Sequence, residues 1–172
     1  RALVAALHTT EFPDMLSAQS SNRLQSATAD SSALALWQMM EQSGLRALAL
    51  GGRQLLPVVQ GGMGVGVSAH RLAGTVASMG AMGTIASVDL RHHHPDLAEC
   101  TRQLPMGPES KETIDAANLE ALRREIAQAK AIAAGRGLIA VNVMKALNAY
   151  AASVRTALQA GADAVVVGAG LP

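Results

Sequence analysis

The fold is indicated by one stretch, PVVQGGMGVGVS at residues 57–68. The apolar run Leu56–Val59 predicts a strand, the glycines predict a loop, and Ser68 is expected to cap a helix. Glycine has no Cβ, so another molecule can approach its backbone closely. A strand, a glycine loop and a helix in this order form ligand sites at the carboxyl ends of parallel strands. The spacing is not that of the dinucleotide fingerprint, whereas a flavin or another flat ligand fits.

Three further apolar runs follow, at Met82–Ser87, Leu138–Val143 and Ala164–Val167. Continuous apolar runs are typical of strands buried on both faces, and such strands are usually parallel. With the first run they predict four neighbouring parallel strands in chain order, joined by right-handed crossovers. The fold class is α/β. The pattern suits the N-terminal half of a TIM (β/α) barrel at least as well as an open sheet, because a full barrel takes about 250 residues.

Helices are predicted between these strands. One has Leu72, Val76 and Met79 on one face and ends at Gly80. The segment Asp89–Ser110 contains three prolines and is expected to be a long loop. A long helix is then marked by apolar residues at helical spacing, namely Leu119, Leu122, Ile126, Ala129 and Ala133.

The outer faces and ends of the later helices also carry signals. Glu120 is expected to pair with Arg123 or Arg124 on the solvent side of the long helix. Asn148 is expected to cap the last helix, which Gly161 should end.

Three segments are expected. Residues 1–31 are small and polar without a period, which indicates a disordered or irregular extension. Residues 32–44 predict a helix that ends at Gly44 and covers the open end of the barrel or sheet, with one face made by Leu36, Trp37 and Met40. Residues 45–172 form the barrel segment, which would stop after about four strands.

Composition excludes several function classes. Net charge is +1 and aromatic residues make up 2%, so there is no basic stripe with aromatic partners and nucleic-acid binding is not expected. No apolar run approaches the ~20 residues of a membrane helix. The single cysteine, Cys100, rules out an internal disulfide and favours a reducing compartment, so we expect a cytoplasmic protein.

Four short motifs resemble those of a known family. They are PVVQGGMG at 57–64, LAG at 72–74, GTI at 83–85 and IAVNVM at 139–144. Together they resemble the nitronate monooxygenase family, formerly called 2-nitropropane dioxygenase. Flavin-dependent enoyl-acyl-carrier-protein reductases are relatives of that family. The resemblance covers about Leu55 to Pro172, and it implies an FMN-binding barrel.

The resemblance also implies site residues. Backbone around Gly61, Gly62 and Met63 would lie against the flavin, and the Asn142 side chain would hydrogen-bond it. Considered without the family, Asn142 is a polar residue in an apolar strand, and a buried amide needs partners. Two interpretations stay open: a ligand contact at the strand's carboxyl end, and a core asparagine bonded to neighbouring backbone.

The implied reaction is the FMN-dependent oxidation of alkyl nitronates with dioxygen. The family's catalytic histidine lies in a Gly-Gly-His context that these residues lack, so the resemblance places it beyond Pro172. We therefore expect a fragment that contains no catalytic residue and is inactive alone. One alternative is a flavin-dependent enoyl-thioester reductase that uses NAD(P)H. The other is a non-catalytic α/β interaction module without flavin.

A few polar residues remain as candidates for the substrate or phosphate side of the site: Lys145, Gly168, His92 and His93. Lys145 follows the Asn142 strand directly, where it would meet an anionic group or be a solvated loop charge. His92 and His93 would line a substrate entrance or lie in an exposed loop. No metal site is expected, because adjacent histidines lack ligand spacing. A half-barrel exposes sheet edges, so self-association, for example as a homodimer, is expected.

Overall fold

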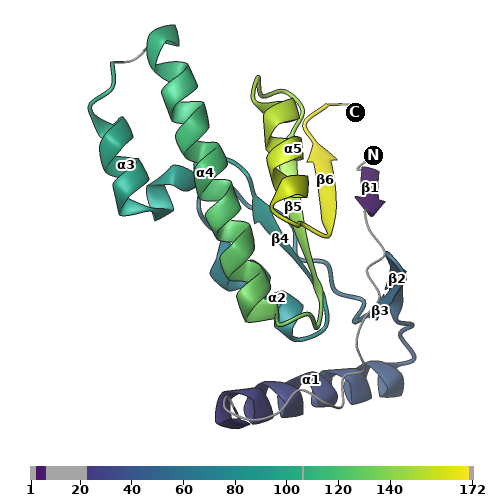
Figure 1. Cartoon of the computed structure of the whole chain (residues 1–172). Helices are drawn as coiled ribbons and strands as arrows, with labels where there is room; N and C mark the ends of the chain where they lie inside the picture. Colours follow the sequence, from purple (N-terminus) through teal and green to yellow (C-terminus); the bar gives the residue numbers. More distant parts are fainter. Residues whose placement is uncertain (1–2, 7–22, 106, 171–172) are drawn as a thin grey trace.

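The computed structural model describes residues 3–6, 23–105 and 107–170. Its centre is a sheet of three parallel strands, β4 (Met82–Ala86), β5 (Leu138–Met144) and β6 (Ala164–Gly168). A short strand, β1 (Leu3–Ala6), pairs antiparallel with the outer edge of β6, which gives the order β1-β6-β5-β4. The α/β class and three of the four predicted parallel strands are therefore confirmed, and the described strands form an open sheet (Figure 1).

The first prediction, a strand at Leu56–Val59, is wrong, because this segment does not form a continuous strand. Leu56–Val59 meets the sheet at a single parallel bridge, between Val59 and Met82. The Val58 N–H donates back to the Leu56 carbonyl at 2.7 Å, a tight turn around Pro57 that prevents a continuous ladder. The segment nevertheless runs beside β4, in the position that the sequence predicts.

A β-hairpin precedes this segment and was not predicted. Its strands, β2 (Leu48–Leu50) and β3 (Arg53–Leu55), pair antiparallel. Gly51 and Gly52 join them with φ of 58° and 76°, values that a two-residue hairpin turn requires and glycine adopts without strain.

The N-terminal helix, α1 (Arg23–Ser43), begins earlier than predicted. The irregular extension therefore does not reach residue 31, since Arg, Leu, Gln and Ala in this stretch favour a helix. Gly44 ends the helix with φ 72°. Met40 is buried and packs with half-buried Trp37 near the start of β4, as predicted, whereas Leu36 is exposed. Much of the predicted extension, residues 7–22, lies outside the described residues.

The predicted loop Asp89–Ser110 is wrong. It contains a 3-10 turn, η1 (Leu90–His93), a helix, α3 (Pro95–Arg102), and the first turn of α4 (Pro108–Ala133). Each of the two α-helices has proline in its first turn. Proline fits there because its missing N–H would have no intrahelical acceptor.

Two other helices connect the strands, α2 (His70–Ser78) and α5 (Tyr150–Gln159). Neither has the predicted cap: the N-cap residues are Ala69 and Ala149, and neither makes a side-chain capping bond. Ser68 and Asn148 are thus corrected as caps. None of the described helices combines the length and apolar composition needed to cross a bilayer.

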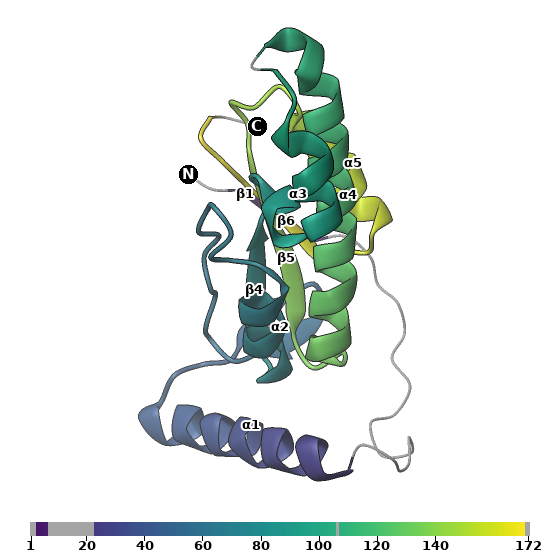
Figure 2. The same cartoon turned by 90° about the vertical axis from the view of Figure 1, so that its left-hand side faces the viewer.

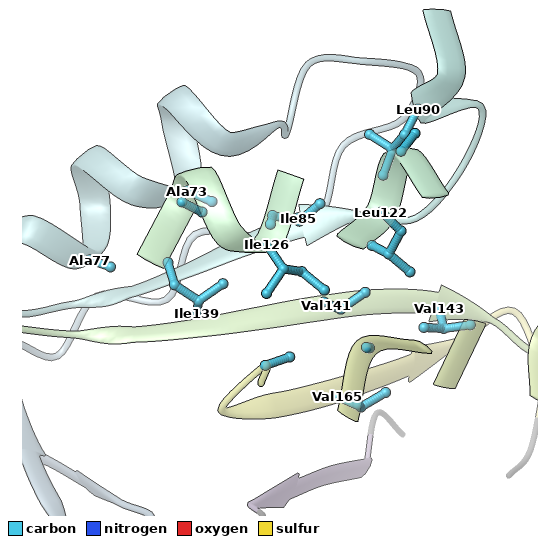
Figure 3. Packing of buried hydrophobic residues seen from close by; sticks show 14 of the residues in the cluster. Ala73, Ala77, Ile85, Leu90, Leu122, Ile126, Ile139, Val141, Val143 and Val165 are labelled. Atoms are coloured by element: carbon cyan, nitrogen blue, oxygen red, sulfur yellow. The ribbon is translucent and has the colours of Figure 1, made fainter. Parts of the chain in front are cut away.

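Helices α2, α4 and α5 cover one face of the sheet (Figures 1 and 2). Their contact with the strands is the main core, drawn in Figure 3. The α4 stripe is confirmed, with Leu122, Ile126 and Ala129 buried. On α2 the prediction is off by one position. Ala73 and Ala77 are buried, whereas the predicted residues Leu72, Val76 and Met79 are only half-buried. Small residues at the buried positions let α2 approach α4 closely.

The opposite face of the sheet is covered only in part. At the amino end, Leu55 of the hairpin packs on the sheet with the side chains of Met82, Leu138, Ala140 and Ala164. Asn142 lies on this same face, because alternate residues of a strand point the same way. The carboxyl end of the face, with Asn142 and Gly168, therefore lies beyond the part that the hairpin covers.

Candidate functional site

Three of the predicted site residues meet at the carboxyl end of the sheet. Gly62 contacts Asn142 so closely that a Cβ on the glycine would lie 2.5 Å from Asn142 Cβ and 2.8 Å from its Nδ2. On the other side, a Cβ on Gly168 would lie 3.8 Å from Asn142 Oδ1. Asn142 is thus flanked by two glycines, and only glycine fits at position 62.

The loop that carries Gly62 is closed by Ser68, which is fully buried. The Ser68 hydroxyl accepts from the Met63 N–H at 2.9 Å and from Gln60 Nε2 at 2.8 Å, and it donates to the Gly61 carbonyl at 3.2 Å. The Gln60 Oε1 accepts from the Thr84 N–H on the edge of β4. These bonds fix residues 60–68, called the glycine loop below, against the sheet.

Several polar groups at this edge have no partner among the described residues. The N–H groups of Gly61 and Gly62 donate to none of them, and the Asn142 side-chain amide makes no hydrogen bond with them. Asn142 is half-buried. Polar groups near the interior are normally bonded to protein, water or ligand. Among the described residues, no neighbouring backbone group satisfies the Asn142 amide, and the ligand interpretation stays a prediction.

Met63 and Lys145 have different surroundings. The Met63 N–H is used by Ser68, and the Met63 side chain is exposed, so the loop offers the glycine amides rather than that of Met63. Lys145 lies at the same edge, where its N–H donates to the Gly168 carbonyl at 2.8 Å. Its ammonium group stands 4.4 Å from the Tyr150 ring centroid, a cation–π contact.

The histidine run is divided between different surroundings. His92 is exposed. The exposed His93 ring lies against Gly66, where a Cβ would meet its Nε2 and where the φ of +75° favours glycine. His93 thus packs on the glycine loop at Gly66. Neither ring makes a hydrogen bond to Asn142 among the described residues.

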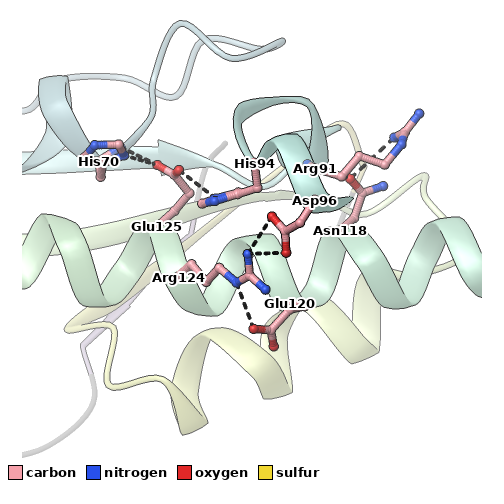
Figure 4. Close-up of polar contacts among 8 residues, drawn as sticks. All are labelled: His70, Arg91, His94, Asp96, Asn118, Glu120, Arg124 and Glu125. Carbon is pink, nitrogen blue, oxygen red and sulfur yellow. Dashed lines mark hydrogen bonds and ion pairs between the residues drawn. The ribbon is translucent and has the colours of Figure 1, made fainter. Parts of the chain in front are cut away.

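A buried polar cluster was missed in the sequence. Glu125 of α4 is completely buried between His70, at the start of α2, and His94, at the start of α3 (Figure 4). A signal for it exists: Glu125 interrupts the apolar stripe of α4, between Leu122 and Ile126. A charge at a buried helical position needs partners, and sequence alone does not say which residues supply them.

A second polar contact joins α3 to α4 on the surface. Arg124 Nη1 donates to both carboxylate oxygens of Asp96, at 3.0 and 2.8 Å, and Arg124 Nε donates to Glu120 at 3.0 Å. The hydrogen bond from Arg124 lowers the pKa of Asp96, and the same bond raises the pKa of Arg124. The predicted pairing of Glu120 with Arg124 is confirmed, and Arg123 reaches the same carboxylate at 3.4 Å.

Comparison with known proteins finds no family model, no curated protein and no solved structure that matches the chain. Among the residues that the structure describes, no group of three or more His, Cys, Asp or Glu side chains could hold a metal ion. That a purified sample carries no stoichiometric metal stays a prediction, which elemental analysis of untagged protein would test.

Proposed function

We propose that this chain is part of an FMN-dependent oxidoreductase of the nitronate monooxygenase type, and that the carboxyl edge of its sheet holds the isoalloxazine. The observation that carries the proposal is the Asn142 amide, which is half-buried between Gly62 and Gly168 and lacks a partner among the described residues. An amide that can donate and accept suits the alternating carbonyl and nitrogen edge of a flavin.

The glycine loop supplies the second support. The amides of Gly61 and Gly62 are available as donors, and neither residue has a Cβ to hold a flat ring away. The loop is held in advance by Ser68 and Gln60, so little order has to be gained on binding.

The roles proposed for these residues are binding and orientation. FMN, when bound, supplies the redox chemistry by taking electrons from the substrate and passing them to dioxygen. Asn142 and the loop amides fix the position of the ring, and Lys145 is proposed to attract an anionic group at the same edge. No described residue is assigned as the catalytic base.

The half-barrel interpretation belongs to this proposal. Helices cover one face of β4, β5 and β6, as they cover the outside of a barrel. The other face carries small side chains at Ala140 and Ala164, next to the Asn142 end. We also propose a cytoplasmic location, because Cys100 is an exposed free thiol.

An FMN titration followed by flavin fluorescence tests the proposal. We expect Asn142→Ala to weaken binding about fivefold, the loss of one hydrogen bond of roughly 1 kcal/mol. The matched control is Asn148→Ala, since Asn148 is an exposed asparagine outside the site. Equal affinities in the two variants would contradict the proposal. Oxygen uptake with an alkyl nitronate, compared with NAD(P)H oxidation by an enoyl thioester, would separate the two reaction types in a homologous chain that contains the catalytic histidine, because no described residue is assigned as the base.

A further inference from the structure

The buried Glu125 joins the end of the glycine loop to two other segments. Its Oε2 accepts from the backbone N–H of His70 at 2.6 Å and lies 2.8 Å from His70 Nδ1. Its Oε1 lies 3.0 Å from Nε2 of His94. Figure 4 shows the carboxylate between the two rings, which come from opposite directions.

The contact with His70 replaces a missing helix cap. The first N–H groups of a helix have no intrahelical acceptor, and Ala69, the N-cap residue of α2, offers no side chain to them. Glu125 accepts the first of these N–H groups from a different helix. Because His70 follows Ser68 by two residues, this bond also fixes where the glycine loop ends.

The charges around Glu125 are few. On its own helix, Arg124 is engaged by Asp96 and Glu120. From α2 only His70 faces the carboxylate, and from the η1–α3 segment only His94 does, among the described residues. A buried carboxylate without a counter-charge is costly. The two imidazole rings are therefore the groups that can provide one.

The contact between Glu125 and His94 is a close approach without a hydrogen bond. The His94 Nε2 and the Glu125 Oε1 are both buried, and neither has a hydrogen bond of good geometry, although they lie 3.0 Å apart. Histidine gains a proton in mildly acidic solution and is neutral in mildly alkaline solution. An imidazolium at His94 or His70 would give Glu125 the opposite charge that it lacks.

We propose that Glu125 is a positioning residue for the glycine loop and that protonation of His70 and His94 strengthens its hold. The loop is then most firmly held in mildly acidic solution, where an imidazolium faces the carboxylate. The hold weakens as pH rises and the rings lose their protons. The consequence for FMN affinity rests on the proposed function, whereas the order of the loop can be measured without any ligand.

Hydrogen–deuterium exchange of the loop amides tests this, at about pH 6 and about pH 8. Rates are corrected for the intrinsic effect of pH. In the wild type we expect exchange of the hydrogen-bonded amides of Met63, Ser68 and His70 to be several-fold slower at the lower pH. Glu125→Gln should speed exchange and abolish the pH difference. Glu120→Gln, which removes a surface charge from the same helix, should behave as the wild type.

A second variant keeps the test decisive if Glu125→Gln does not fold. The double change His70→Gln and His94→Gln keeps two amide groups beside Glu125 and removes both titrating rings. We expect it to exchange at the same corrected rate at both pH values. A pH difference that persists in this double variant, or in a folded Glu125→Gln variant, would overturn the proposal.

FMN titrations of the same proteins at the same two pH values separate this inference from the proposed function. Affinity that follows loop protection supports both. If no protein binds FMN while the exchange difference is present, the proposed function fails and the role of Glu125 stands. If FMN binds and the exchange of the wild type does not depend on pH, the role of Glu125 fails alone.

Discussion

Gly62 has no room for a side chain, and this makes one residue a test of the whole site. A Cβ there would meet Asn142 Cβ, which is fixed to β5, so the loop would have to move. We expect Gly62→Ala to cost about 1–3 kcal/mol of stability, the usual range for overpacking, and to weaken FMN binding. Urea unfolding and the flavin titration measure the two effects.

The control for this substitution is Gly107→Ala. A Cβ on Gly107 has nothing within 4 Å, and its φ of 167° is extended backbone that any residue adopts. Gly107 is the N-cap residue of α4, where alanine is less favourable than glycine, so we expect a smaller loss of stability than for Gly62→Ala and unchanged FMN binding. If Gly62→Ala were as stable as the control, the close contact with Asn142 would be wrong.

Single residues also show what the sequence could and could not predict. Asn142 and Gly62 were predicted to share one edge, because both follow or end strands of one sheet, and the structure brings them together. The sequence predicts Ser68 as a helix cap, because serine before a helix usually caps it, and this prediction is wrong. Here it closes a loop, and the helix receives its acceptor from Glu125. A contact of that kind depends on tertiary packing, which no local pattern contains.

Among the elements, the β2–β3 hairpin depends on Leu55 for its attachment to the sheet. Leu55 is fully buried in the cluster at the amino end of the strands. Leu55→Ala should cost about 2–5 kcal/mol, the range for an apolar side chain lost from a core. Leu45→Ala, at an exposed leucine just before the hairpin, should change the free energy of unfolding little. Equal effects would show that the hairpin does not pack on the sheet.

The surface contact between α3 and α4 gives a pH prediction. Because Arg124 lowers the pKa of Asp96 in the folded protein, the contact stabilises the fold above the ordinary aspartate value of 3.8. This stabilisation is lost as pH falls through the lowered pKa. Asp96→Asn should therefore lower the free energy of unfolding slightly at neutral pH and not in strong acid.

The effect of Asp96→Asn is expected to be small, because the Asp96 side chain is exposed and that of Arg124 is partly exposed, so water screens the pair. Urea unfolding at neutral and strongly acidic pH measures it, and Glu99→Gln, which removes a carboxylate from an exposed pair within α3, is the control. A difference between wild type and Asp96→Asn that grows in acid would contradict the assignment.

An element is predicted correctly where its apolar period repeats over several turns. It is predicted poorly where proline or glycine is the main signal, because these residues occur in more than one kind of structure. The stripe of α4 identified that helix because it repeats over several turns. Pro95 and Pro108 predict a loop in the sequence, although proline is also common in the first turn of a helix. Gly51-Gly52 is a two-residue hairpin signal, and the structure places the turn of the β2–β3 hairpin there. The run Leu56–Val59 has strand composition, and only its turn at Pro57 explains why it pairs at a single residue.

For the molecule as a whole, we expect self-association. The outer edge of β6, the fourth predicted strand, pairs with β1, so this edge is not open as predicted. Apolar side chains are nevertheless exposed on and beside the glycine loop, namely Val58, Val59, Met63, Val65 and Val67. Apolar side chains gathered on one segment favour contact with another molecule. Size-exclusion chromatography with light scattering should show a dimer or larger species that grows with concentration.

A charge in this patch should reduce the association. Val65→Lys places an ammonium group at an exposed position, and Leu34→Lys does the same on α1, away from the loop. We expect the first to shift the protein toward monomer and the second to leave the distribution as it is. A wild type that is monomeric at every concentration would contradict the expectation.

The hydrogen bond that Glu125 accepts from the His70 N–H also sets an order of assembly. Helix α2 has nine residues, too few to persist alone in water, and its capping acceptor lies 55 residues further along the chain. During synthesis the glycine loop would leave the ribosome well before α4 exists to hold it. We therefore expect the loop to form late, after α4 has packed on the strands. In pulse-labelled refolding, its amides should gain protection after those of β5.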